Sequence, residues 1–127
     1  MRYMLILLTC LVNFTGHAAF KPTAFYLQTK VLTESQKIEH LLKYVESLKG
    51  AMFIRNGESH PPAEAAAHLR MKWEKAGNKV KTAVDFIEIC ASKSSMSGKP
   101  YMIKMPDGKE LPARDVLMRE LKRIQQK

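Results

Sequence analysis

Cysteine is scarce in this 127-residue sequence, which contains only Cys10 and Cys90. Cys10 falls in a stretch that resembles a removable export signal, so Cys90 would remain alone in the mature chain. A single cysteine cannot form an internal disulfide, and the mature protein must therefore be stabilised by packing. Cys90 lies on an apolar helical stripe, and no histidine and acid partner for it is evident. We expect a buried, inert thiol rather than a nucleophile.

Long hydrophobic runs are also absent. The apolar run Met4–Phe14 is interrupted by polar residues and is shorter than the ~20 apolar residues that a membrane-spanning helix needs. Arg2 precedes this run and Gly16-His17-Ala18-Ala19 follows it, which is the pattern of a signal peptide with small residues at the cleavage site. We predict a signal peptide over residues 1–19, cleaved near Ala18 or Ala19. The mature protein would be periplasmic or secreted, with no transmembrane span.

The same stretch argues against a lipid anchor. Thr9 directly precedes Cys10, and the apolar run before this cysteine is too brief for a lipoprotein signal.

Acidic residues are few, since 12 Asp and Glu face 21 Lys and Arg, which gives a formal charge of +9. Removal of Arg2 with the signal peptide lowers this charge by one, to +8. Such an excess attracts anionic partners, and export excludes nucleic acid among them. We expect an unknown envelope partner or an anionic ligand. The lysines are spread along the chain, so a solvated basic surface is the alternative.

Several catalytic motifs are missing. The chain has neither the glycine and lysine spacing of a phosphate-binding P-loop nor the zincin arrangement of two histidines four residues apart around a glutamate. The S-x-x-K motif of serine acyltransferases is absent as well. We predict no cofactor, and no residue is assigned a catalytic role.

The hydrophobic periodicity predicts one α+β domain. We expect a signal peptide over residues 1–19, an N-terminal arm over 20–32 and a single compact domain over 33–127. About four helices would pack with a two- or three-stranded antiparallel sheet. The expected helices span residues 34–49, 62–76, 83–92 and 113–125, and the expected strands span 51–55, 101–105 and a short return at 109–111.

Local signals support these boundaries. Thr33 with Gln36, and Thr82 with Asp85, have the spacing of helix capping boxes. The pair Asn56-Gly57 frequently closes a β-hairpin. Because Pro61-Pro62 follows so closely and is typical of a helix start, we expect no strand after this turn.

Three groups of polar residues are candidates for a binding site or for a structural polar cluster. The first is His60, Glu64 and His68. On a helix, positions 64 and 68 lie ~6 Å apart on one side, and His60 precedes that helix. The three side chains are a hypothetical zinc site, and the alternative is a hydrogen-bonded structural cluster.

The second group is the serine-rich loop, with Ser94, Ser95, Ser97 and Lys99. Its hydroxyls and amides next to a glycine are suited to an anion. A solvated, hydrogen-bonded turn is the alternative.

The third group is basic and contains Arg55, Arg70, Lys72 and Lys81. These residues either converge into a binding patch or merely solubilise the protein. Arg55 also has Glu58 and Glu64 as potential ion-pair partners.

Taken together, the ordered motifs resemble the YfeK-like family, small exported proteins of Gram-negative bacteria grouped as a domain of unknown function. The resemblance covers about residues 33–124. It rests on Phe53-Ile54-Arg55-Asn56-Gly57, His60, Glu64-Ala65, His68-Leu69-Arg70, Lys72, Lys81-Thr82-Ala83, Phe86-Ile87, Ala91-Ser92, Ser94-Ser95 and Ser97-Gly98-Lys99-Pro100-Tyr101.

The resemblance implies signal-directed export and a compact small domain, and it brings no activity or cofactor. This chain departs from the family pattern at Pro61-Pro62, where the family has a threonine or similar cap. We expect helix 62–76 to lack a side-chain cap, at a cost of ~1 kcal/mol that proline stiffness partly offsets.

The sequence therefore favours a non-enzymatic exported domain that binds a ligand or has a structural role in the envelope. The polar cluster would include Arg55, Asn56 and the three groups above. The alternative is a small metal-dependent or serine-loop hydrolase that uses His60, Glu64 and His68.

Overall fold

The computed structural model describes residues 30–127. The predicted signal peptide and most of the predicted arm lie outside this range. Within it the chain forms, in order, α1 (Glu34–Ser47), β1 (Met52–Arg55), β2 (Glu58–His60), α2 (Pro62–Ala76), a 3-10 turn η1 (Gly77–Lys79), α3 (Ala83–Phe86), a π-helix η2 (Ile87–Ala91), β3 (Met102–Lys104), β4 (Glu110–Pro112) and α4 (Ala113–Gln125). The predicted α+β class is confirmed.

Hydrogen bonds at the helix starts agree with the sequence signals. The Thr33 hydroxyl accepts from the backbone N–H of Gln36, whose side chain accepts in return from the Thr33 N–H. Thr82 and Asp85 form the same reciprocal box before α3. Helix α2 begins after Pro61 with no side-chain cap, as predicted. These boxes satisfy backbone donors that a helix end leaves unpaired.

The sheet contains four antiparallel strands in the order β2-β1-β3-β4. The prediction that no strand follows Asn56-Gly57 was wrong. Asn56 and Gly57 both have positive φ, at 51° and 82°, which suits the tight turn of a two-residue hairpin. Three residues then pair with β1 before Pro61 is reached. The two prolines thus limit the length of β2 without preventing it, and the extra edge strand raises the count to four.

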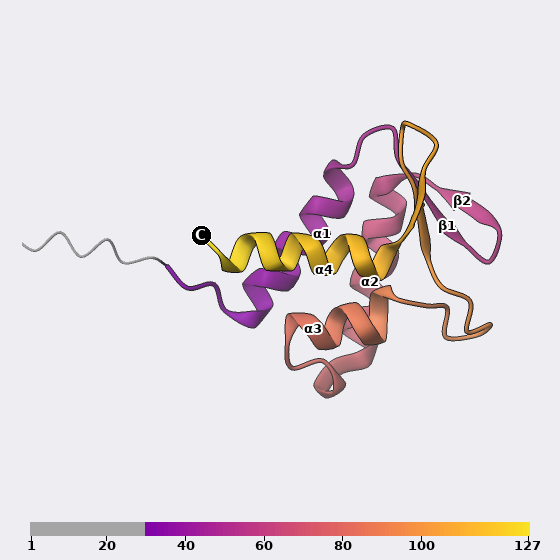
Figure 1. Cartoon of the computed structure of the whole chain (residues 1–127). Coiled ribbons are helices and arrows are strands. Elements are labelled where there is room, and N and C mark those ends of the chain that lie inside the picture. Colours follow the sequence, from indigo (N-terminus) through magenta and orange to yellow (C-terminus); the bar gives the residue numbers. More distant parts are fainter. Residues whose placement is uncertain (1–29) are drawn as a thin grey trace, which may run out of the picture.

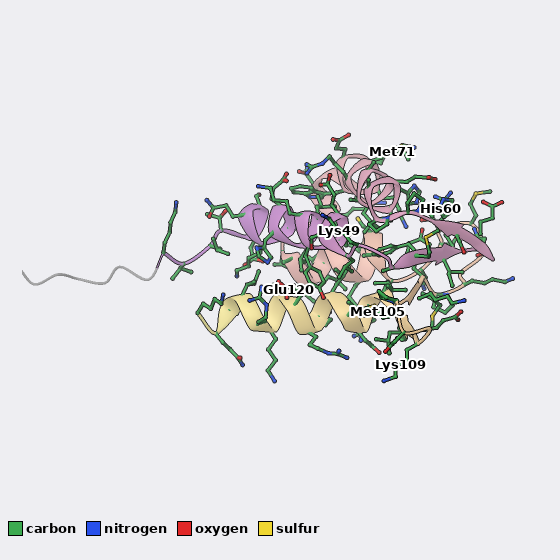
Figure 2. All side chains as sticks on the ribbon, turned by 90° about the horizontal axis from the view of Figure 1, so that it is seen from above. Lys49, His60, Met71, Met105, Lys109 and Glu120 are labelled. Atoms are coloured by element: carbon green, nitrogen blue, oxygen red, sulfur yellow. The ribbon has the colours of Figure 1, made fainter. Side chains whose placement is uncertain are left out.

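Helices and sheet enclose one hydrophobic core. Figure 1 shows the strands gathered at one end of the helical layer, and Figure 2 shows α1 lying between α2 and α4, both of which it contacts. The largest fully buried side chains come from α1, α3, η2, β3 and α4: Phe86, Leu41, Leu42, Ile87, Ile103, Leu117, Val45 and Cys90. Burial raises the pKa of the Cys90 thiol, which agrees with the predicted buried, inert cysteine.

The predicted helix over residues 83–92 changes its winding. Residues 83–86 are α-helical, and residues 87–91 form a π-helix. Periodicity cannot separate the two, because one wide turn barely alters the apolar pattern. Short π-helical turns are frequent at functional sites, and this one contributes Ala91 to the cavity described below.

Within residues 30–127, no helix combines the length and the apolar character that crossing a bilayer requires.

Candidate functional site

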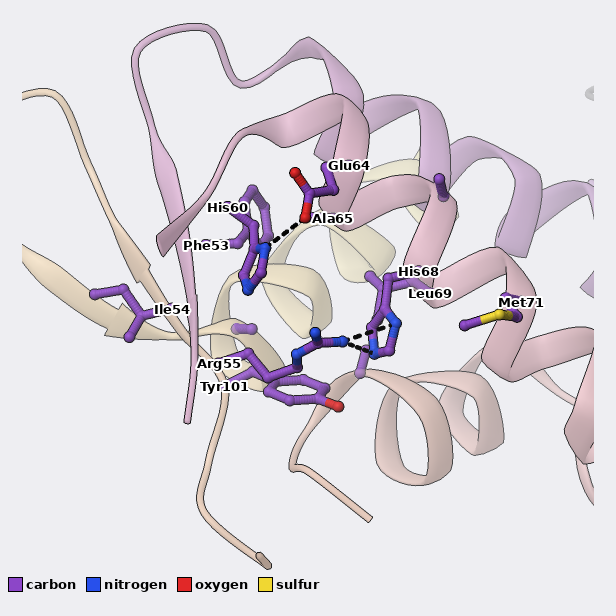
Figure 3. A pocket seen from close by; sticks show the side chains of 13 residues that line it. Phe53, Ile54, Arg55, His60, Glu64, Ala65, His68, Leu69, Met71 and Tyr101 are labelled. Carbon is purple, nitrogen blue, oxygen red and sulfur yellow. Dashed lines mark hydrogen bonds and ion pairs between the residues drawn. The ribbon is translucent and has the colours of Figure 1, made fainter. Parts of the chain in front are cut away.

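A cavity of about 310 Å³ lies between the β1–β2 hairpin and α2. Phe53 and Arg55 are two residues apart in β1, so their side chains lie on the same face of the strand. Phe53 pairs with His60 across the hairpin. That face is turned toward α2, which supplies Glu64 and His68 (Figure 3). Tyr101, just before β3, also lines the cavity. Three consecutive elements, β1, β2 and α2, therefore meet at this site with the segment just before β3.

Small side chains leave this space open. Four of the lining residues are alanines, namely Ala65 and Ala67 on α2, Ala91 at the end of η2 and Ala113 at the start of α4. Ala65, Ala91 and Ala113 are buried, whereas Ala67 is exposed. The other lining residues are apolar except for Arg55, His60, Glu64, His68 and Tyr101, so the cavity is largely apolar with a few polar side chains. Ligand sites usually have this composition.

Arg55 and His68 form the polar contact of this cavity. Nη1 of Arg55 lies 2.9 Å from Nδ1 and 2.8 Å from Nε2 of His68. Both residues are partly buried. Burial, then Arg55, then Lys72 lower the pKa of His68, so the ring is neutral at pH 7.

This contact contains a mismatch between donors. A neutral imidazole offers one acceptor nitrogen and one N–H, and a guanidinium offers donors only. One of the two ring nitrogens accepts from Nη1, and the other presents its N–H to the same donor. An acceptor beside the pair, within hydrogen-bond distance of Arg55 and of the ring N–H, would satisfy both groups.

Lys72 and Tyr101 extend the same donor set. Lys72 Nζ donates to the Tyr101 hydroxyl at 3.1 Å and to the Lys93 carbonyl at 3.2 Å. It also lies 4.9 Å from the Tyr101 ring centroid, a cation–π distance. The Tyr101 ring meets His68 edge-on at 6.4 Å. Because the Tyr101 oxygen accepts from Lys72, its own proton is available for another acceptor.

His60 and Glu64 form a separate pair. Nδ1 of His60 lies 2.6 Å from Glu64 Oε1, and Nε2 lies 3.9 Å from Glu58 Oε2. Nε2 is buried without a hydrogen-bond partner. Helix spacing placed Glu64 and His68 on one side of α2, but each of them pairs with a residue of the hairpin instead.

The hypothetical zinc ligands therefore do not form one set, because His68 contacts a cation. Across residues 30–127, no three His, Cys, Asp or Glu side chains are grouped as a metal site would require. The suggested ion pairs of Arg55 with Glu58 or Glu64 are also wrong, because Glu64 pairs with His60 and Arg55 with His68.

The serine-rich loop is fastened to the hairpin turn. Ser94 is buried, and its hydroxyl accepts from Asn56 Nδ2 and from the backbone amides of Met96 and Ser97. The Ser97 hydroxyl donates to Asn56 Oδ1 and accepts from the Lys99 amide. These hydroxyls and amides thus bond to one another, as the turn interpretation predicts. The side chains of Ser95 and Lys99 are exposed.

The basic residues converge only in part. Arg55 and Lys72 both lie near His68, and after burial their charges lower the pKa of its ring. Arg70 instead makes a double hydrogen bond to Glu39 of α1 at 2.7 Å. Lys81 is exposed, and only its backbone amide bonds, to Asp85. Arg70 and Lys81 are thus structural or solvated residues rather than parts of the cavity.

Sequence reasoning did not select Tyr101 as a site residue. Tyr101 begins a predicted strand, and nothing in the sequence around it indicated a role in a binding site. Sequence reasoning also missed the buried Glu120, which His40 and Arg123 hold at 2.7 and 2.6 Å. The His40 contact joins α1 to α4, and no sequence-local pattern reports it, whereas Glu120 and Arg123 are three residues apart on α4.

Comparison with known proteins adds a family but no activity. Residues 32–125 match the model of a family of unknown function, DUF5329. The chain is 41% identical over 68 residues to the "Uncharacterized protein YfeK" of Salmonella typhimurium strain LT2. That alignment covers 54% of this chain and 57% of the relative, less than two thirds of its length. No solved structure matches.

Proposed function

Because this chain belongs to the DUF5329 family of unknown function, we propose its role from the site alone: the domain binds a small apolar anion in the cavity between the β1–β2 hairpin and α2. It does so without catalysis, as an exported protein of the cell envelope. The signal-like pattern of residues 1–19 supports export, and the relative's name supplies no activity.

The observation that carries the proposal is Arg55, a guanidinium beside an apolar cavity without a carboxylate partner among the described residues. Three of the four other arginines in residues 30–127 have such a partner, namely Arg70 with Glu39, Arg114 with Glu88 and Arg123 with Glu120. The fourth, Arg119, is exposed on α4 and lies outside this cavity. Within residues 30–127, the Arg55 guanidinium hydrogen-bonds to the neutral ring of His68. A guanidinium is well suited to two-point binding of an anion.

The surroundings favour an anion over a neutral ligand. Burial lowers the pKa of His68, and the nearby Arg55, Lys72, His60 and Lys75 act in the same direction, so the charges that act on this ring favour an anion beside it. Partial burial weakens solvent screening of that charge. The apolar walls would hold the ligand's hydrocarbon part, and the charged group would lie against Arg55.

The binding role is tested with two variants and a matched control. Arg55→Gln removes the cation. Ala67→Leu fills the cavity from an exposed position of α2, where leucine is a good helix former. Ala63→Leu makes the same change at an exposed position of that helix outside the cavity lining.

Calorimetric titration with heptanoate at low ionic strength is the measurement. We expect Arg55→Gln and Ala67→Leu each to weaken binding by about tenfold or more. Ala63→Leu should bind like the parent protein, and neutral hexanol should bind poorly. Equal affinity for heptanoate in all three variants, each folded by circular dichroism, would exclude this cavity as the binding site.

A further inference from the structure

The polar side of the cavity carries more donors than a carboxylate can use. We propose that the anion is a phosphate monoester attached to a short apolar group, held by Arg55, His68 and Tyr101 with Lys72 behind them. This inference rests on the proposed binding function and specifies the class of ligand.

The first argument is the number of donors. A carboxylate has two oxygens, and one guanidinium can occupy both through paired N–H groups. Here the His68 N–H faces Arg55 Nη1 without an acceptor, and the Tyr101 hydroxyl proton is free because Lys72 supplies that oxygen's hydrogen bond. A phosphate monoester presents three terminal oxygens. It can accept from Arg55, His68 and Tyr101 together.

The second argument is charge. Arg55 and Lys72 supply two permanent positive charges around His68. A phosphate monoester carries about −1.5 to −2 at pH 7, whereas a carboxylate carries one negative charge. Glu64, the acidic residue in the cavity lining, is already paired with His60 at 2.6 Å. The dianion therefore matches the cations that face this position.

The third argument is the apolar space beside those donors. The cavity volume of about 310 Å³ equals roughly ten water molecules at ~30 Å³ each. A chain of several carbons would occupy that space while its phosphate stays at Arg55, His68 and Tyr101, which Figure 3 shows among the lining side chains. Free inorganic phosphate would leave the apolar walls uncovered, so the ester rather than the free ion is the expected ligand.

Four probes separate these possibilities by calorimetric titration: hexyl phosphate, heptanoate, inorganic phosphate and hexanol. We expect hexyl phosphate to bind about tenfold more tightly than heptanoate, because it engages the additional donors. Inorganic phosphate should bind at least about tenfold more weakly than hexyl phosphate, because it buries no apolar surface.

Variants then identify the donors. Lys72→Gln and Tyr101→Phe should each weaken hexyl phosphate by about five- to tenfold and heptanoate by less than about twofold. Lys122→Gln, which removes one exposed lysine from α4, is the charge-matched control and should leave both affinities unchanged. Circular dichroism establishes that each variant is folded.

The outcomes distinguish the two proposals. Heptanoate binding as tightly as hexyl phosphate, with both weakened by Arg55→Gln and Ala67→Leu, would overturn the phosphate inference and leave the binding function standing. Inorganic phosphate binding as tightly as hexyl phosphate would also overturn the inference. Failure of hexyl phosphate and heptanoate to bind the parent protein would overturn both proposals.

Discussion

At the scale of single residues, the most informative contact is between Arg55 and His68. A guanidinium within 3 Å of both nitrogens of an imidazole opposes protonation of that ring. Burial and the nearby Lys72 act in the same direction, so the pKa of His68 lies below its ordinary value of 6.5. The ring therefore makes stability depend on pH.

We predict that the free energy of unfolding decreases as pH falls from 6.5 toward 5.5. In this window the unfolded chain binds more protons at residue 68 than the folded chain, so acid favours unfolding. Above 6.5 the contribution of His68 to stability is complete. Urea titrations of the parent protein and of His68→Gln should show a shallower pH dependence in the variant.

The carboxylates whose pKa is lowered titrate below this window. The carboxylates with lowered pKa, Glu34, Glu39, Asp85 and Glu120, have ordinary values of 4.5 or below and lose their contribution at more acidic pH. Ala63→Leu is the control, because it leaves every titratable group in place. An identical slope in His68→Gln and the parent protein between pH 5.5 and 6.5 would contradict the prediction.

At the scale of elements, the β1–β2 hairpin and the serine-rich loop behave as one unit. Asn56 sits in the turn with φ 51° and bonds Ser94 and Ser97 across the gap between them. The hairpin in turn carries Arg55 and His60. A side chain in the turn thereby fixes a loop about forty residues away in sequence.

We expect Asn56→Gly to separate these two elements. Glycine keeps the positive φ that the turn needs, so β1 and β2 should remain paired. The loop loses two side-chain hydrogen bonds, each worth about 0.5–1.5 kcal/mol. Hydrogen exchange at the Ser94 and Gly98 amides, which bond to Lys99 and Ser94 carbonyls, should accelerate.

Amides between β1 and β2 provide the internal control in the same sample. Unchanged exchange at Ser94 and Gly98 would mean that the backbone bonds alone hold the loop. Accelerated exchange throughout the hairpin would mean that Asn56 supports the turn itself.

Local sequence signals predict where helices and strands begin, but not which of these elements contact one another. The capping pairs at Thr33 and Thr82 predicted two helix starts, because both members of each box lie within four residues of one another. Strand β2 was missed because its three residues carry little hydrophobic pattern. The Asn56-Gly57 turn correctly indicated a hairpin. Pro61-Pro62 starts the next helix but does not prevent a short strand before it.

At the scale of the whole molecule, the formal charge is +9, and the basic residues differ in whether they have a carboxylate partner. Many cations are solvated or bonded to carboxylates, as Arg70 and Arg114 are. Arg55 instead lines one cavity, and Lys72 lies next to it on the Tyr101 hydroxyl. Net charge alone thus describes solubility and general attraction to anions, and the cavity decides where binding takes place.

We predict that the protein is exported and shortened when it is expressed in a Gram-negative host. The charge before an apolar run and the small residues after it are the features that signal peptidase requires. Mass spectrometry of the periplasmic fraction should find a first residue of Ala19 or Phe20. A chain retained in the cytoplasm with residues 1–19 intact would contradict this.

The sequence by itself determined the α+β class, four helices, the caps of α1 and α3 and the buried state of Cys90. These properties follow from apolar periodicity and from hydrogen bonds between near neighbours, which the order of residues records directly. Only the tertiary structure decided which polar residues meet. Strand register and helix packing placed Arg55 against His68, Tyr101 beside both and Arg70 against Glu39, because such contacts depend on how distant elements are positioned in space.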